Sequence, residues 1–380
     1  MDALATPLPK DWEIKTFRDI STINQGLQIP ISQRLKAPTE HAKFYITIQA
    51  LNNRKEFEYI KTYNESVVCH KDDILMTRTG NTGMVITNIE GVFHNNFFKI
   101  NFDRTLINKD FLVYFLSLEQ TQKTILKKAG TSTIPDLNHN DFYSLSIPLP
   151  PLNEQIAIAN ILSDVDRYLY SLDALILKKE SVKKALSFEL LSQRKRLRGF
   201  NQNWQRVRLG DICEIVKGQQ INKISLNNTD KYPVINGGID FLGYTNKFNV
   251  SKNTIAISEG GTCGYVRFMS SNFWSGGHNY SLQKISNKVN NLCLYHILKS
   301  YEKDIMKLGV GSGLKNIQLK ALKDFEIPLP PLNEQIAIAN ILSDLDHEII
   351  SLKNKKRQFD NIKKALNHDL MSAKIRVLKK

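Results

Sequence analysis

The sequence of 380 residues has few cysteines and no long apolar run. Its four cysteines, Cys69, Cys213, Cys263 and Cys293, are scattered without Cys-x-x-Cys spacing, which argues against a zinc site and a disulfide framework. No apolar stretch approaches the roughly 18 residues of a membrane-spanning helix. The first residues, MDALATPLPKDW, lack the pattern of a secretion signal. We therefore expect a cytoplasmic chain that contacts no membrane.

Motifs of enzyme chemistry are also missing. The sequence contains no G-x-x-x-x-G-K-[ST] phosphate loop, no strand-placed G-x-G-x-x-G and no G-x-S-x-G. None of its eight histidines forms H-E-x-x-H. The sequence therefore predicts no catalytic residue, no metal ligand and no cofactor bound by this chain.

What the sequence does contain is a 20-residue stretch that occurs twice. Residues 147–166 read IPLPPLNEQIAIANILSDVD and residues 327–346 read IPLPPLNEQIAIANILSDLD, which differ at one position. Internal repeats outrank other sequence signals, and two copies spaced 180 residues apart are too widely separated for a solenoid. The repeat indicates a duplicated half-molecule that forms a pseudo-dimer within one chain.

Each copy predicts a long helix. The prolines keep the entry extended, Asn153 is a suitable N-cap, and apolar residues then recur at spacings of four and three, as in a coiled-coil seam. The first helix is expected over Glu154–Ser192, about 58 Å at 1.5 Å per residue, with Gly199 as its C-cap. Two such seams, related by a pseudo-twofold axis, predict an antiparallel pair. The alternative is that each amphipathic helix covers only its own domain.

The net charge of +15 lies mostly on these helical arms. Residues 167–198 contain nine Lys or Arg against three Asp or Glu, and residues 351–380 contain ten against two. A basic surface attracts nucleic acid. A solvated helix face that keeps the protein soluble is the alternative interpretation.

Outside the repeat, the two halves diverge. They share an opening with a tryptophan and a D-I-x-x-I-x-x-G motif, at Trp12 and at Trp204. Short β-rich runs follow, and each half then has one predicted helix, Lys109–Ala129 and Leu292–Leu308. We expect an α/β (α+β) chain with globular domains at 1–150 and 200–330 and helical spacers at 151–199 and 331–380.

Two polar loops in the divergent regions are related. Residues 77–85 (TRTGNTGMV) align with residues 258–266 (SEGGTCGYV), and His94-Asn95 resembles His278-Asn279. Side chains of these types read base edges, and glycine lets the backbone approach a duplex. The alternative is a hairpin tip with ordinary surface polarity. The residues predicted to contact DNA are Thr77, Arg78, Thr79, Asn81, Lys217, Gln219, Ser258, Glu259, Thr262, His278 and Asn279.

The paired IPLPPLNEQIAIANILSD segments, each preceded by a diverged domain, resemble the specificity subunit of a type I restriction-modification enzyme. The resemblance covers residues 12 to about 374. It implies two target recognition domains, each of which reads one half of a split site in double-stranded DNA. It also implies partner subunits: methyltransferases that carry S-adenosylmethionine, and restriction subunits that use ATP and Mg. The alternative is a pseudo-symmetric coiled-coil adaptor that reads no bases.

Two finer predictions follow. The repeated polar positions predict a shared surface for two methyltransferase subunits, formed by Asn153, Glu154, Gln155, Asn160, Asn333, Glu334, Gln335 and Asn340. In the aligned loops, Arg78 only donates hydrogen bonds and Glu259 only accepts them. We therefore expect Arg78 to contact guanine in the first half-site and Glu259 to contact cytosine in the second.

Overall fold

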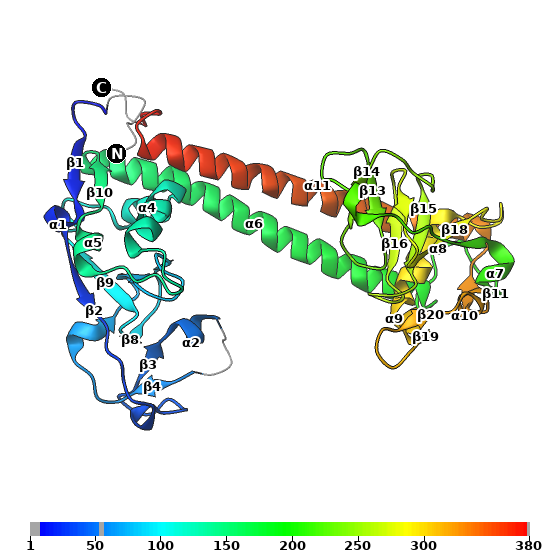
Figure 1. Cartoon of the computed structure of the whole chain (residues 1–380), viewed down its shortest axis with the longest axis horizontal. Coiled ribbons are helices and arrows are strands. Elements are labelled where there is room, and N and C mark those ends of the chain that lie inside the picture. The colour runs from blue at the N-terminus through cyan, green and yellow to red at the C-terminus, as the bar shows by residue number, and fades with distance from the viewer. Residues whose placement is uncertain (1–7, 53–56, 378–380) are drawn as a thin grey trace. The chain divides into compact units, whose positions relative to one another are not determined.

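The structure is a computed structural model that describes residues 8–52 and 57–377. The chain forms two compact units: the first contains residues 1–172 and 355–380, and the second contains residues 173–354. Helix α6 (Leu152–Leu191) and helix α11 (Leu332–Met371) each contribute one half to each unit (Figure 1). Each unit is therefore a globular part together with two half-helices.

The first unit combines short strands with short helices, as the predicted α+β class requires. Its strands are β1 (Glu13–Thr16), β2 (Ser21–Gln25), β3 (Lys43–Ile46), β4 (Tyr59–Ile60), β5 (Val68–Cys69), β6 (Ile74–Thr77), β7 (Val85–Ile86), β8 (Gly91–Phe93), β9 (Phe97–Phe102) and β10 (Ser146–Leu149). Its shorter helices are α1 (Phe17–Ile20), α2 (Ile48–Asn52), α3 (Lys109–Leu116), α4 (Glu119–Ala129) and α5 (His139–Tyr143).

The second unit repeats this plan with different lengths. Its strands are β11 (Gln205–Arg208), β12 (Glu214–Lys217), β13 (Tyr232–Ile235), β14 (Gly243–Thr245), β15 (Thr254–Ser258), β16 (Val266–Met269), β17 (Trp274–Ser275), β18 (Asn279–Gln283), β19 (Gly309–Val310), β20 (Asn316–Ile317) and β21 (Glu326–Leu329). Its shorter helices are α7 (Leu209–Ile212), α8 (Asn291–Ser300), α9 (Glu302–Lys307) and α10 (Leu319–Lys323).

The sheets carry the duplication beyond the repeated stretch. The order β2-β9-β6-β7 in the first unit corresponds to β12-β18-β15-β16 in the second, and both sheets are antiparallel. A parallel pair also recurs, as β3 with β8 and as β13 with β17. In both units the opening strand pairs with the proline segment, with Ile14 opposite Pro148 and Arg206 opposite Pro328.

Two predicted helices are broken into two. The segment 109–129 forms α3 and α4, which are separated at Ser117 and Leu118, and the segment 292–308 forms α8 and α9. Periodicity alone did not reveal these breaks, because each pair of short helices folds its apolar faces onto one core. Leu112 and Ile125 belong to the same buried cluster in the first unit, as Leu294 and Ile305 do in the second.

The ends of the long helix also differ from the prediction. Helix α6 begins at Leu152, so Asn153 lies inside the first turn, and the Pro151 carbonyl accepts from the Glu154 and Gln155 amides at 2.9 and 3.0 Å. The helix ends at Leu191, and Gln193 adopts the left-handed conformation, with φ 61°. The prediction of Asn153 as N-cap and Gly199 as C-cap was therefore wrong. Asn153 is part of the helix itself, and Gln193 rather than a glycine is the left-handed residue that follows it.

The helix seam has two uses. Ile158 and Leu162 of α6 are buried in the core of the first unit, together with Leu370 and Met371 from the end of α11. Ile338, Leu342 and Leu191 take the corresponding places in the second unit. Burial of each such side chain contributes about 1.5–3 kcal/mol. Both interpretations of the seam therefore hold, since its first positions cover the unit's own core and the later ones face the other helix.

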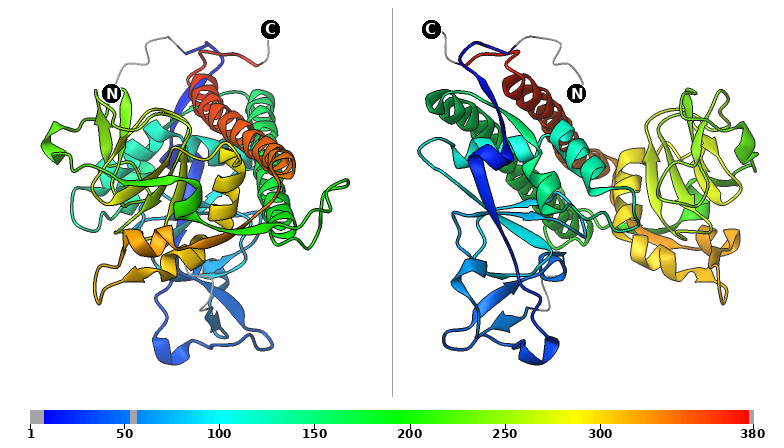
Figure 2. Two further views of the ribbon diagram at one scale, coloured as in Figure 1. Left: turned by 90° about the vertical axis from the view of Figure 1, so that its right-hand side faces the viewer. Right: turned by 60° about the vertical axis from the view of Figure 1, so that its left-hand side comes forward.

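Helices α6 and α11 pair antiparallel and lie side by side in the views of Figures 1 and 2. In the first unit the rings of Tyr168 and Phe359 are 4.6 Å apart, and Lys363 binds Asp166 at 2.5 Å. In the second unit the matching pair is Lys183 with Asp346. Residue numbers rise along one helix as they fall along the other, which confirms the predicted antiparallel coiled coil.

Part of the basic charge on the arms is used within this helix pair. Lys179 binds Glu348 at 2.7 Å and Lys353 binds Glu180 at 2.6 Å. Such exposed pairs contribute about 0–1 kcal/mol each. Several of the lysines that give the arms their charge thus have acidic partners on the opposite helix.

Candidate nucleic-acid interface

In both units the same strand end leads into a glycine-bearing turn. The Thr77 amide donates to the Met84 carbonyl at 3.0 Å, and the Ser258 amide donates to the Tyr265 carbonyl at the same distance. Gly83 and Gly264 each donate back to the strand end at 2.8 Å. The two loops therefore have one backbone design, and the sequence alignment that made Arg78 and Glu259 equivalent is confirmed.

The second predicted alignment was wrong by two residues. The backbone amide of Arg78 donates to the Asn96 carbonyl, and the backbone amide of Glu259 donates to the His278 carbonyl, both at 2.8 Å. Strand register agrees, because Thr77 lies opposite Phe97 and Ser258 lies opposite Asn279. Asn96, not His94, is thus the counterpart of His278. A two-residue sequence match carried no information on strand register.

Arg78 lies in the first unit, beside an acid that the sequence did not single out. Its guanidinium donates to Asp136 at 2.7 Å and lies 5.7 Å from the centre of the Phe98 ring. The Arg78 side chain is only 18% exposed, whereas that of Asp136 is 50% exposed. Asp136 is 58 positions from Arg78, and no motif or spacing links them in the sequence.

The other predicted residues of this loop divide into buried and exposed. The Thr77 side chain is buried, and its hydroxyl donates to the Asn81 carbonyl at 2.6 Å while it accepts from the Met84 amide at 2.9 Å. Thr79 forms an isolated bridge with Asp136. Asn81 is exposed, with a left-handed φ of 58°. Thr77 therefore holds the turn, and Asn81 is available at its tip.

Glu259 is the centre of the corresponding site in the second unit. Its carboxylate accepts from Lys217 at 2.7 Å. The Tyr280 hydroxyl lies 3.3 Å from the same carboxylate oxygen and 3.0 Å from the Ile317 carbonyl oxygen. His278 Nδ1 lies 3.9 Å from the other carboxylate oxygen of Glu259. Glu259 is 11% exposed, and Lys217 is 54% exposed. Burial, assisted by the Glu259 charge, raises the pKa of Tyr280 to about 12, so the phenol remains a donor.

The structure brings all the predicted residues of the second unit to one end of its sheet. Ser258 and Asn279 are buried and lie 3.4 Å apart. The Thr262 amide donates to the Gly237 carbonyl at 2.8 Å. Gln219 is exposed, and its carbonyl accepts from the Trp274 indole at 2.8 Å. Trp274 is a further residue of this surface that the sequence analysis missed.

Glycine is required where these loops meet. A Cβ atom on Gly237 would lie 2.6 Å from the Gly260 carbonyl oxygen, and one on Gly261 would lie 2.8 Å from the Gly237 carbonyl oxygen. Both glycines also have positive φ, at 79° and 67°. Side chains at these positions would push the loops apart. The close approach holds the loop that contains Gly237 against the turn that carries Glu259 and against His278.

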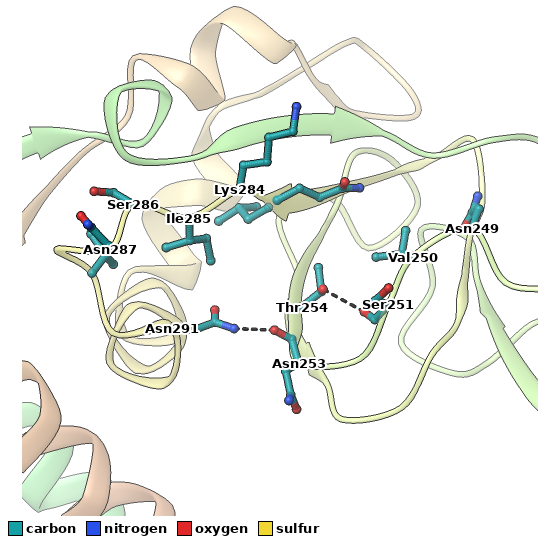
Figure 3. Close-up of a pocket in the computed structure, with 13 residues that line it drawn as sticks. Asn249, Val250, Ser251, Asn253, Thr254, Lys284, Ile285, Ser286, Asn287 and Asn291 are labelled. Atoms are coloured by element: carbon teal, nitrogen blue, oxygen red, sulfur yellow. Dashed lines mark hydrogen bonds between the residues drawn. The ribbon is translucent and has the colours of Figure 1, made fainter.

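A polar depression of about 500 Å³ lies at the other end of the same sheet (Figure 3). It is bordered by the start of β15 and by the loop between β18 and α8. The Thr254 hydroxyl donates to the Ser251 carbonyl at 2.9 Å, and the Asn291 amide donates to the Asn253 carbonyl (Figure 3). Asparagine amides and hydroxyls dominate its lining. This depression is separate from the loops around Glu259.

Half of the predicted partner surface is not surface. Glu154 is buried and accepts from the Trp12 indole at 3.1 Å and from Arg376 at 2.7 Å. Glu334 is buried in the same way against Trp204, at 3.0 Å, and Arg196, at 2.8 Å. Their identity in the two copies therefore reflects identical contacts inside each unit.

The glutamines have the same explanation. Gln155 is buried, accepts from the Asn108 amide at 2.9 Å and donates to the Leu106 carbonyl at 3.0 Å. Gln335 accepts from the Asn290 amide at 2.7 Å and donates to the Lys288 carbonyl at 3.1 Å. The prediction that Glu154, Gln155, Glu334 and Gln335 face a partner was wrong, because polar residues that lock a helix onto its domain look like surface residues in sequence.

The asparagines of the predicted partner surface are exposed. Asn153 and Asn160 lie on one face of α6, and Asn333 and Asn340 lie on the corresponding face of α11. Between them, Ile156 and Ile336 are each 41% exposed. An apolar residue between two amides is thus presented identically by the two helices.

Residues 8–52 and 57–377 offer neither a metal site nor a membrane span. These residues contain no group of three or more His, Cys, Asp or Glu side chains that could hold a metal ion. Among the helices of this part of the chain, none has both the length and the apolar character to cross a bilayer.

Known proteins share this architecture. A solved S subunit of a type I restriction-modification system from M. genitalium superimposes with a TM-score of 0.69, at 21% identity, over 96% of this chain and 98% of that chain. A type I restriction enzyme specificity subunit of Methanocaldococcus jannaschii is 25% identical over 97% of this chain and 94% of its own length.

A shorter alignment has higher identity. A putative type I specificity subunit of Mycoplasma pneumoniae is 38% identical over 165 residues, which make up 41% of this chain and 44% of that protein. The alignment thus spans less than half of that relative. The family model described as "Type I restriction modification DNA specificity domain" matches residues 9–179 and 201–359, one match for each half of the repeat. The chain therefore belongs to the family of type I restriction-modification DNA specificity domains.

Proposed function

We propose that this chain is the specificity subunit of a type I restriction-modification complex, and that each unit reads one half of a bipartite site in double-stranded DNA. The observation that carries the proposal is the pair of equivalent loops around Arg78 and Glu259. They share their backbone hydrogen bonds but differ in side-chain chemistry. One scaffold with two sets of polar side chains suits two different base sequences.

In this proposal the chain recognises DNA and carries out no chemistry. S-adenosylmethionine, ATP and Mg belong to partner subunits, and the complex acts in the cytoplasm. The residues proposed to face DNA are Thr79, Asn81, Lys217, Gln219, Thr262 and His278, together with Asp136. Arg78 and Glu259, from which the sequence predicts direct contacts with guanine and cytosine, are themselves largely covered in the structure, at 18% and 11% exposed.

We also propose that two copies of one methyltransferase subunit bind the chain. Support comes from the matching exposed faces of α6 and α11, with Asn153 and Asn160 on one and Asn333 and Asn340 on the other. The two faces would accept the same partner surface. Native mass spectrometry with excess methyltransferase should give a complex with two copies per chain. A stable one-to-one complex would contradict the two-site proposal.

The decisive experiment is methylome sequencing of cells that carry the cognate methyltransferase with and without this chain. Methylation should appear only with both proteins, at a motif of two specified blocks around an unspecified gap. The chain alone should be retained on DNA with a sequence preference that survives added salt. Retention without any preference, and no new methylated motif, would favour the adaptor alternative.

A further inference from the structure

The two recognition loops present opposite charges to solvent. The sequence predicts an exposed cation in the first unit and an exposed anion in the second, but the structure exposes an anion in the first and a cation in the second. In the first unit the cation, Arg78, is covered (18% exposed), and its partner Asp136 is exposed (50%). In the second unit the anion, Glu259, is covered (11%), and its partner Lys217 is exposed (54%). Each unit has a largely covered charge that is paired with a more exposed counterion.

The exposed partners come from different places in the shared design. The Arg78 carbonyl accepts from the Leu137 amide at 2.8 Å, and the Glu259 carbonyl accepts from the Ile317 amide at 2.9 Å, so Asp136 corresponds to Asn316. Gln25 lies opposite Phe98, and Lys217 lies opposite Tyr280, so Lys217 corresponds to Gln25. Each unit therefore has a charged residue where the other has a neutral amide.

Exposure decides which member of each pair can meet a base. A base edge must approach within about 3 Å of a donor or an acceptor, and a covered side chain gives it little access. Asp136 binds Arg78 through one carboxylate oxygen, and a carboxylate has about four acceptor sites in all. Lys217 binds Glu259 with one of its three ammonium donors. Both exposed groups keep hydrogen-bonding capacity for a ligand.

We propose that Asp136 and Lys217 are the specificity-determining residues of the two units, a proposal that rests on the proposed function. Asp136 accepts a hydrogen bond from cytosine N4 in the first half-site, and Lys217 donates to guanine O6 and N7 in the second. Aspartate and lysine prefer these partners in the major groove. An exposed carboxylate would repel phosphates, which also favours a base edge as its contact.

Arg78 and Glu259 are then positioning residues. Arg78 is held over Phe98 and orients Asp136 from behind. Glu259 packs beside the Tyr280 hydroxyl, 3.3 Å away, and orients Lys217, with His278 Nδ1 3.9 Å from its second oxygen. A charged partner fixes a long, flexible lysine side chain in one direction and so lowers the entropy lost on binding.

The test uses the full chain with its methyltransferase and maps methylation on a library of duplexes with randomised sites. Each variant borrows the amide of the other unit: Asp136→Asn and Lys217→Gln. Asp136→Asn should raise methylation at other bases by about tenfold at one position of one block, and Lys217→Gln should do so at one position of the other block. The exposed residues Asp110 and Lys252 provide matched controls, as Asp110→Asn and Lys252→Gln, which should leave both blocks unchanged.

The positioning role has its own readout. Glu259→Gln should relax the same base position as Lys217→Gln, and the double variant should relax it no further. Arg78→Gln should coincide with Asp136→Asn in the same way, whereas Arg78→Lys should restore part of the selectivity. A loss of structure would instead lower methylation across a whole block.

The outcomes separate this inference from the proposed function. If the wild type methylates a motif of two blocks, and neither Asp136→Asn nor Lys217→Gln changes either block, the inference is overturned and the proposed function stays intact. Equally reduced methylation at every site in Lys217→Gln would show a phosphate contact and would also overturn it. Absence of any bipartite motif in the wild type would overturn the proposed function itself.

Discussion

Glu334 is buried at the start of α11 because two distant donors satisfy its carboxylate. The Trp204 indole and Arg196 both reach it, at 3.0 and 2.8 Å. Glu334→Gln keeps the shape but removes the charge, so we expect the free energy of unfolding to fall by about 2 kcal/mol. Urea denaturation followed by tryptophan fluorescence measures the change. Glu348→Gln, at an exposed ion pair, is the control and should cost less than about 0.5 kcal/mol.

His296 makes the second unit sensitive to acid. It is buried and lies 3.3 Å from the Ser343 hydroxyl. Burial, with a smaller contribution from the charge of Lys183, lowers its pKa from 6.5 to about 4. As the pH falls below 6.5, His296 becomes protonated in the unfolded chain, whereas in the folded chain it becomes protonated only near pH 4. Stability should therefore fall with falling pH in this window, by about 1.4 kcal/mol per pH unit.

The measurement is the free energy of unfolding at several pH values between 7 and 4, for the wild type and for His296→Leu. The variant loses the Ser343 hydrogen bond at every pH but should show the shallower pH dependence. His347→Leu, at an exposed position of α11, controls for removal of a histidine. Parallel curves for wild type and His296→Leu would mean that the imidazole is protonated without cost in the folded chain.

At the scale of elements, the segment after α11 completes the first unit. Arg376 donates to Glu154 at 2.7 Å and to Asp11 at 2.9 Å, and Val377 packs against the core. Removal of residues 374–380 should therefore destabilise the first unit by about 3 kcal/mol and leave the second unit intact. Limited proteolysis with fragment identification should show faster cleavage within the parts of the chain that form the first unit, 8–172 and 355–373, and unchanged cleavage within 173–354.

The control for that truncation removes only residues 378–380, which keeps the contacts of Arg376 and Val377. It should resist protease like the full chain. If both truncated chains were equally resistant, the Arg376 contacts would contribute nothing measurable to the first unit.

The sequence predicted elements well where periodicity and repetition coincide. The long helices and their antiparallel pairing were recoverable, because an apolar seam specifies a face and a copy of it specifies a partner. The breaks within 109–129 and 292–308 were not, because tertiary packing rather than propensity folds each segment back. The loop alignment around Arg78 and Glu259 was correct because both glycines of each turn have positive φ, a conformation that favours glycine, and so they occupy the same positions in the two loops.

At the scale of the whole molecule, the proposed function predicts a ruler. Seven residues added to the middle of both α6 and α11 keep the seam in register and lengthen each helix by about 10 Å. The gap between the two specified DNA blocks should grow by about three base pairs, since each base pair occupies about 3.4 Å. Methylome mapping measures the gap. Altered bases within either block would contradict the ruler.

The site was less predictable than the architecture, because it depends on which side chains are covered. Asp136 and Trp274 join the two proposed DNA-binding surfaces from segments with no sequence relation to the loops that they meet. The same difficulty turned Glu154 and Gln155 into predicted surface residues. The residue type alone does not tell whether a polar side chain is buried with hydrogen-bond partners or exposed to solvent.

The closure of the first unit by residues 355–377 has a consequence for biosynthesis. The second unit is one continuous stretch, 173–354, and all of it leaves the ribosome before the segment that carries Leu370, Met371 and Arg376. Domains fold as they emerge during translation. The N-terminal part of the first unit, up to residue 172, therefore has an incomplete core until residues 355–377 have been synthesised. During that interval it is the first unit, and not the second, that a chaperone or a protease would find open.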